Sequence, residues 1–174
     1  GGDNGQWTLS LKGAGALLYK VNASITFADG NVMDGATLGV GVTTRQKMTA
    51  ELGEGVEYIV NIPAKDGISM RHSVTYHTAH PFCVVRLEVK NEGADPVEIS
   101  KLSPIVVPPG SLKALNAKTT VNLRRFVMQG PCAVYSPEAA PYAVFMNDPG
   151  ANVTLAFGSL TNGRADTAVD LQPF

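Results

Sequence analysis

The sequence predicts an all-β fold, a two-layer antiparallel β-sandwich with little or no helix, and three observations support this prediction. Apolar and polar residues alternate along most of the strand-like segments, which sends successive side chains to opposite faces of a sheet. Turn-forming Gly, Pro, Asn and Asp residues separate these segments at short intervals. Val, Ile and Thr, which suit a pleated sheet, are frequent throughout the chain. Because alternation leaves each sheet one polar face, two packed sheets are favoured over a single sheet buried on both sides.

The strands follow one another along the whole chain. The segment Leu17–Phe27 is the clearest of them, because an apolar face that begins at Leu17 alternates with a polar face that begins at Lys20. The same reasoning gives the full set of expected strands: Thr8–Leu11, Leu17–Phe27, Leu38–Thr44, Glu57–Ile62, Ile68–His77, Phe82–Lys90, Val97–Val107, Thr120–Val127, Ala133–Tyr135, Tyr142–Met146 and Asn152–Phe157.

The segments between the strands carry turn chemistry. Asn91–Pro96 and Asn147–Gly150 each predict an antiparallel hairpin, and Ala28–Asn31 predicts a chain reversal. Pro104–Leu115 is the most irregular stretch, which we interpret as a loop or a crossing between sheets. Helix evidence is confined to Thr44–Leu52, where a short turn of helix would end at the following glycines.

Length and composition predict one domain over residues 1–174, with residues 1–6 as a flexible tail. The chain has 44% hydrophobic residues, 17% charged residues and a net charge of -1. This balance argues against disorder and against a nucleic-acid partner, which would require a basic stripe. No apolar run approaches the ~18 residues of a membrane-spanning helix, so we expect no membrane span.

The histidines and cysteines are few. His72 and His77 would point to opposite faces of one strand, which argues against a shared metal. We expect His72 to be hydrogen-bonded on an inner face and His77 and His80 to lie at the surface. Cys83 is expected to be a buried small hydrophobe within a strand, with a Cys83–Cys132 disulfide as the alternative.

The sequence predicts no catalytic residue, no metal site and no cofactor in this chain, because its acids are scattered and it has neither a nucleophile elbow nor a phosphate loop. Sugar recognition is the activity that the residues leave open. Aromatic rings for stacking would come from Trp7, Tyr58, Tyr76, Tyr135 and Tyr142, although alternation also fits these rings to the core. Arg71 and His77 lie on the polar side of their strand. The candidate carbohydrate contacts are therefore Trp7, Arg71, Tyr76 and His77.

Two ordered motifs resemble a known family. His80–Phe82 with VVRLEVKNEGADPVEISKLSPI after Cys83 resembles a strand–turn–strand of the amino-terminal β-sandwich of α-galactosidase-like glycoside hydrolases (family 36, the melibiase group). NVTLAFGSLTNGRADTAVDLQ resembles a later segment of the same domain, whereas LRRFVMQGP stands where that family has an aromatic-rich motif. The residues that carry the match are Asn91, Gly93, Pro96, Val97, Ile99, Gly158, Leu160 and Thr161.

This resemblance implies a sandwich of the galactose-mutarotase-like supersandwich type that precedes a catalytic (β/α)8 barrel. The chain would then be a fragment of a longer multidomain enzyme, a non-catalytic module of a carbohydrate-active enzyme. Its partners would be the downstream catalytic domain of the same polypeptide and carbohydrate. The alternative is an independent immunoglobulin-like binding or adhesion module with a protein or glycan partner. A removed signal peptide would give an extracytoplasmic or secreted location, with a cytoplasmic one as the alternative.

Overall fold

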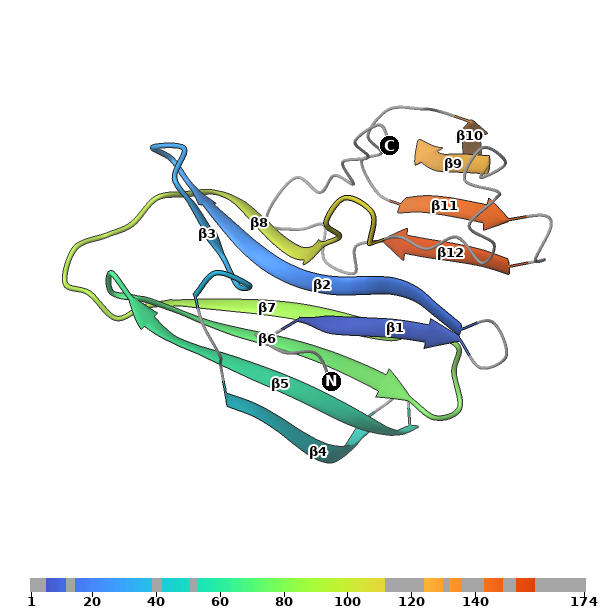
Figure 1. Cartoon of the computed structure of the whole chain (residues 1–174), viewed down its shortest axis with the longest axis horizontal. Coiled ribbons are helices and arrows are strands. Elements are labelled where there is room, and N and C mark those ends of the chain that lie inside the picture. Colours follow the sequence, from blue (N-terminus) through green and yellow to red (C-terminus); the bar gives the residue numbers. More distant parts are fainter. Residues whose placement is uncertain are drawn as a thin grey trace. The chain divides into compact units, whose positions relative to one another are not determined.

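The computed structural model describes residues 6–11, 15–38, 42–50, 53–111, 124–129, 132–135, 143–148 and 153–158 (Figure 1). These residues form twelve strands, β1 to β12, and no helix. The antiparallel sheets confirm the predicted all-β sandwich. In the described part of the chain there is accordingly no helix with the length and apolar character to cross a membrane. The contacts divide the chain into two compact units, residues 1–9 with 18–111 and residues 10–17 with 112–174.

One sheet of the first unit contains four strands that follow sequence order. Each strand pairs antiparallel with the next. A two-residue turn at Asp66 and Gly67, with φ of 51° and 77°, joins the second and third of these strands. Positive φ at both positions suits the right-handed twist of a hairpin, and Asp-Gly is a preferred pair there. The strands are β4 (Val42–Ala50), β5 (Gly53–Lys65), β6 (Ile68–His77) and β7 (Cys83–Asn91).

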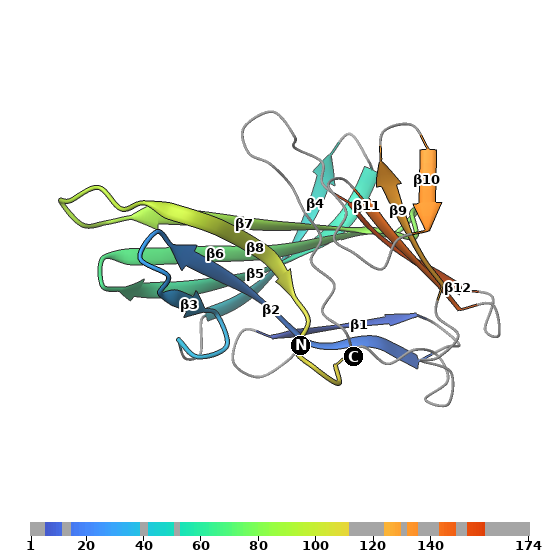
Figure 2. The ribbon, with the colours of Figure 1, turned by 90° about the horizontal axis from the view of Figure 1, so that it is seen from above.

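A second sheet is built around one long central strand. This central strand is β2 (Gly15–Phe27), which is hydrogen-bonded to the other three strands of its sheet. Figures 1 and 2 show the stretch of β2 next to β3 and β8 lying as a layer against β5, β6 and β7. The other three strands are β1 (Trp7–Leu11), β3 (Val32–Asp34) and β8 (Ile99–Val106).

The hydrophobic core of the first unit lies between these two layers. Phe27, Leu38, Val60, Leu87 and Val89 pack around its margin and are partly buried. Burial of large aliphatic side chains is the main stabilising contribution of such an interface. The buried members of the core are Ile25, Met33, Ile62, Ile68 and Met70.

The second unit contains a four-stranded sheet in the order β10-β9-β11-β12. β11 and β12 pair antiparallel from Asp148 opposite Val153, which confirms the hairpin predicted at Asn147–Gly150. The bounds are β9 (Arg124–Gln129), β10 (Cys132–Tyr135), β11 (Ala143–Asp148) and β12 (Val153–Gly158).

The hairpin predicted at Asn91–Pro96 is wrong. β7 pairs with β6, whereas β8 pairs with β2, so this turn carries the chain from one layer of the sandwich to the other. Turn residues specify that the chain reverses, but long-range packing decides whether the two flanking strands bond to each other or face each other across a core. Of the two flanking strands, β7 contributes Leu87 and Val89 to the margin of that core.

The prediction of a short helical turn at Thr44–Leu52 is also wrong for residues 44–50, because these residues belong to β4, which runs from Val42 to Ala50 and pairs with β5 over its whole length. Residues 51 and 52 lie outside the described part of the chain. The predicted irregular stretch begins too early, because β8 continues through Pro104 to Val106. The register against β2 shifts around Pro104, which is where a strand tolerates a residue without an N–H. The short strand β3 was not predicted.

Several expectations fall partly or wholly outside the described residues. They are the tail at residues 1–5, the strand residues 39–41, 120–123, 142 and 152, and the side chains of Cys132, Tyr135 and Tyr142.

Candidate functional site

The two faces of the β4–β7 sheet carry different chemistry. Residues directly opposite each other in an antiparallel pair share a face. Tyr58 lies opposite Arg45 and Val74, and Val74 lies opposite Val85. In the next row across the sheet, Tyr76 lies opposite Val56 and Cys83. We call this surface the tyrosine face; it consists of Arg45, Lys47, Val56, Tyr58, Val74, Tyr76, Cys83 and Val85.

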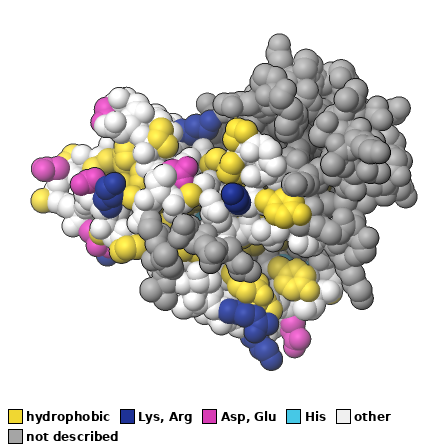
Figure 3. Space-filling model, in the orientation of Figure 1, with side chains coloured by type: hydrophobic (Ala, Val, Ile, Leu, Met, Phe, Trp, Pro, Cys, Tyr) yellow, Lys and Arg dark blue, Asp and Glu magenta, His cyan; other side chains and the backbone are white. Residues whose placement is uncertain are grey.

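The tyrosine face continues the core-facing side of the sheet. Val60 and Ile62, further along β5 on this side, pack in the core, whereas Tyr58 is 42% exposed and Tyr76 is 49% exposed. The two tyrosines are diagonal neighbours on adjacent strands, a relation in which aromatic side chains can reach each other at about 7–8 Å. Figure 3 shows hydrophobic side chains next to a group of Lys and Arg side chains over β4 and β5. This side of the sheet thus carries two exposed aromatic side chains next to the half-buried Val56, Val74 and Val85.

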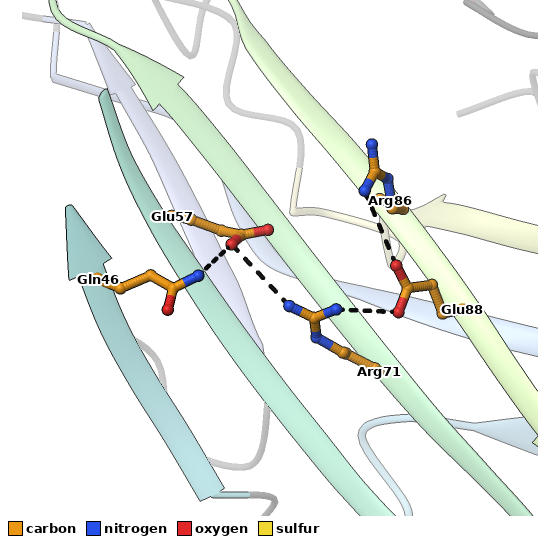
Figure 4. Close-up of polar contacts among 5 residues, drawn as sticks. All are labelled: Gln46, Glu57, Arg71, Arg86 and Glu88. Atoms are coloured by element: carbon orange, nitrogen blue, oxygen red, sulfur yellow. Dashed lines mark hydrogen bonds and ion pairs between the residues drawn. The ribbon is translucent and has the colours of Figure 1, made fainter. Parts of the chain in front are cut away.

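The opposite surface, which we call the polar face, carries a ladder of hydrogen bonds and ion pairs across four strands (Figure 4). Gln46 Nε2 donates to Glu57 Oε2 over 2.7 Å, and Arg71 Nη2 lies 4.0 Å from the same oxygen. Arg71 Nη1 donates to Glu88 Oε2 over 3.1 Å, and Arg86 Nη1 lies 3.8 Å from Glu88 Oε1. The charged groups of this face therefore compensate one another.

Replacing Arg71 with methionine is expected to lower the free energy of unfolding by less than about 1 kcal/mol, because its close ion pair with Glu88 is exposed and screened by water. The Arg71 side chain is 41% exposed. Glu57, whose side chain is 13% exposed, lies 4.0 Å from Arg71 and keeps its hydrogen bond from Gln46. Urea denaturation of the variant at low and high salt measures this effect, and the small difference should shrink further at high salt. A loss above about 2 kcal/mol would instead mean that the ladder behaves as a buried network.

His77 does not lie at the surface as predicted. His77 is only 2% exposed, and its Nδ1 has no hydrogen-bond partner among the described residues. Its ring centroid lies 5.9 Å from that of Phe82 and 6.5 Å from that of His80, which is exposed as expected. The prediction failed because β6 is buried on one face at its start and on the other face, at Ser73, Thr75 and His77, near its end.

His72 confirms the prediction of a hydrogen-bonded inner histidine. It is 2% exposed, and its Nε2 lies 2.9 Å from the carbonyl oxygen of Pro104. A carbonyl only accepts, so Nε2 carries the proton. Burial lowers the pKa of His72 below its ordinary value of 6.5, and the hydrogen bond to Pro104 opposes that shift.

The stability of the chain is expected to fall as the pH drops below about 6.5, because unfolded His72 takes up a proton there and folded His72 does so only at lower pH. The loss continues until the pH reaches the folded pKa, with a slope of at most about 1.4 kcal/mol per pH unit from one histidine. His72→Gln keeps a donor for Pro104 and should flatten this dependence between pH 7 and pH 5. His80→Gln, at an exposed position, is the control; an equal slope in wild type and His72→Gln would refute the assignment.

Trp7 and Cys83 complete the placement of the sequence candidates. Trp7 lies in β1 and is partly buried, and its Nε1 is shielded without a partner among the described residues. Cys83 is a free, half-buried thiol whose pKa is raised by burial. The structure does not bring Trp7, Arg71, Tyr76 and His77 together: Tyr76 lies on the tyrosine face, Arg71 and His77 lie on the other side of the sheet, and Trp7 belongs to another sheet.

Sequence reasoning missed Arg45 and Lys47 as members of the tyrosine face. They lie in the segment for which a helical turn was predicted. Under that prediction, the alternation of side chains along the segment could not assign them to a face of a sheet. Once that segment is a strand, the register against β5 is the signal that places them beside the tyrosines. Among the described residues no three His, Cys, Asp or Glu side chains are grouped so that they could hold a metal ion.

No family model, no curated protein and no solved structure matches the chain. What the chain does must therefore be inferred from the chemistry of its own surfaces.

Proposed function

We propose that this chain is a non-catalytic β-sandwich module of a carbohydrate-active enzyme and that it contacts carbohydrate through the tyrosine face. The observation that carries the proposal is the exposure of Tyr58 and Tyr76, at 42% and 49%, on neighbouring strands and on the same side of one sheet. Exposed aromatic side chains gathered on a regular element are typical of binding surfaces.

The chemistry of this face suits a sugar. A pyranose ring has an apolar patch of C–H groups on its face, and a tyrosine ring offers an apolar surface with a hydroxyl at its rim. Val56 lies directly opposite Tyr76 and Val74 directly opposite Tyr58, and both valines are half-buried. Two rings on a sheet are held in place before the ligand arrives, which reduces the entropy that binding must overcome.

The enzyme context is supported by the two motifs that resemble the amino-terminal sandwich of α-galactosidase-like glycoside hydrolases. In that context the reaction belongs to a separate barrel of the same polypeptide, and the sandwich supports it. The native reading frame is the test: it should continue beyond Phe174 into alternating β and α units. A native chain that ends at Phe174 would favour the independent immunoglobulin-like module instead.

Calorimetric titration with galacto-oligosaccharides tests direct contact. We expect wild type to bind with millimolar affinity and Tyr76→Ala to bind at least about tenfold more weakly, a difference of about 1.4 kcal/mol. Leu102→Ala is the matched control, because Leu102 is 49% exposed, as Tyr76 is, but lies in the other sheet of the first unit. Equal affinity of wild type and Tyr76→Ala would remove the tyrosine face from the proposal.

A further inference from the structure

We infer that the carbohydrate bound by the tyrosine face is anionic, a saccharide that carries a carboxylate or sulfate group; this inference rests on the function proposed above. It goes beyond that function because it names the class of sugar. The observation behind it is a pair of cations, Arg45 and Lys47, that lie beside the exposed tyrosines and form no ion pair within the described part of the chain.

The register of β4 against β5 places these cations. Arg45 lies directly opposite Tyr58, and Lys47 lies directly opposite Val56, in the row that continues to Tyr76. Both cationic residues are exposed, and β4 is an edge strand of its sheet. Figure 3 shows the Lys and Arg side chains at this margin next to hydrophobic ones. An anionic group on a sugar stacked against the tyrosines would therefore have cations within reach.

The two faces of the sheet differ in whether their cations form ion pairs. On the polar face, Arg71, Arg86 and Lys90 each have a carboxylate oxygen within 4.0 Å. On the tyrosine face, neither Arg45 nor Lys47 forms an ion pair with any described residue. Glu54 lies on the same side of the sheet and is itself a diagonal neighbour of Lys47. It does not form an ion pair with a described residue either. Among the described residues, two cations and one carboxylate give this part of the surface a positive charge.

The number of charges favours a saccharide over other anionic partners. Binding of an anionic membrane surface usually relies on clusters of about 4–8 Lys and Arg residues, and nucleic-acid binding relies on a basic stripe. The tyrosine face has two cations, and the whole chain has a net charge of -1. A short saccharide with one anionic group per ring needs one or two cations and offers ring faces to the tyrosines.

Calorimetric titration of the whole chain with three probes of matched length tests the inference. The probes are a neutral galacto-oligosaccharide, an oligogalacturonate and a sulfated galacto-oligosaccharide. We expect at least one anionic probe to bind more tightly than the neutral one, with an advantage that shrinks as salt is added. The anionic probe that is preferred identifies the charged group.

Paired variants separate local contact from net charge. Arg45→Gln/Lys47→Gln should weaken binding of the anionic probe by about fivefold to tenfold, the sum expected for two exposed ion pairs. Binding of the neutral probe should not change. Arg86→Gln/Lys90→Gln makes the same change in net charge on the polar face and should leave both affinities as they are. Glu54→Gln should strengthen binding of the anionic probe by about twofold, because it removes a like charge at an exposed position.

The possible outcomes distinguish a failure of this inference from a failure of the proposed function. Equal affinity for neutral and anionic probes, or equal losses in both double variants, overturns the inference and leaves carbohydrate contact in place. Absence of binding to every saccharide overturns both. Tighter binding to anionic lipid vesicles or to single-stranded DNA than to any saccharide would also overturn both.

Discussion

Replacing Ile25 with alanine is expected to lower the free energy of unfolding by about 2–5 kcal/mol. Ile25 is fully buried on β2 and belongs to the core with Met33, Ile62, Ile68 and Met70, which come from both layers of the sandwich. Shortening it removes apolar contact with both layers and leaves a cavity that neighbouring strands cannot close without losing register. Urea denaturation followed by the fluorescence of Trp7, the chain's one tryptophan, measures the loss.

Val32→Ala provides the control for this experiment. Val32 lies on β3 in the same sheet but is 62% exposed, so its shortening should change the free energy of unfolding by no more than about 0.5 kcal/mol. If Ile25→Ala cost no more than Val32→Ala, the two layers would not share the core described above.

Replacing Gly55 with alanine is expected to destabilise the chain by about 2–3 kcal/mol, near the upper end of the usual cost of overpacking. A Cβ on Gly55 would lie 2.7 Å from the carbonyl oxygen of Tyr76 and 3.2 Å from Nδ1 of His77. The closer of these neighbours is backbone, so relief requires β5 and β6 to move apart. The same movement would shift Tyr76, and we therefore expect Gly55→Ala to weaken sugar binding as well.

Gly93→Ala is the matched control for Gly55→Ala. The nearest atom to a Cβ on Gly93 is Oδ1 of the exposed Asn91 side chain, at 3.2 Å, so a small shift of a side chain relieves the contact. That shift strains the hydrogen bonds that Asn91 accepts from Gly93 N–H and donates to the Asp95 carbonyl, but it moves no strand. The free energy of unfolding should then fall by no more than about 1 kcal/mol, the net contribution of one hydrogen bond. Equal tolerance of alanine at both positions would show that β5 and β6 do not approach as closely as Gly55 requires.

The strands could be predicted from the sequence because side-chain direction in a strand is a local property. The alternation of Leu17–Phe27 and Ile68–His77 needs no knowledge of the neighbouring strands, and both segments are strands. What the segments pair with is not local. The turn at Asn91–Pro96 has the residues of a hairpin, but β7 and β8 find their partners elsewhere, so sheet membership could not be predicted from it.

The candidate site shows the same division. Alternation predicts that Tyr76 and Arg71 point to opposite faces, and the register confirms it. Alternation cannot predict which face is covered at each end of a strand, and for this reason His77 was expected at the surface. The grouping of Tyr58 and Tyr76 with Arg45 depends on registers that are fixed by pairing between strands. The tight turn at Asp66 and Gly67 joins β5 to β6.

Methyl NMR spectra recorded during titration with the saccharide that calorimetry favours test the central claim most directly. Val84 and Val85 are adjacent on β7 and lie on opposite faces, with Val85 opposite Val74 and Val84 opposite Thr75. Binding at the tyrosine face predicts shifts of the Val74 and Val85 methyl signals that saturate with the calorimetric affinity, while the Val84 signals stay in place. Saturating shifts at Val84 with none at Val74 and Val85 would contradict the account, because the sugar would then occupy the polar face.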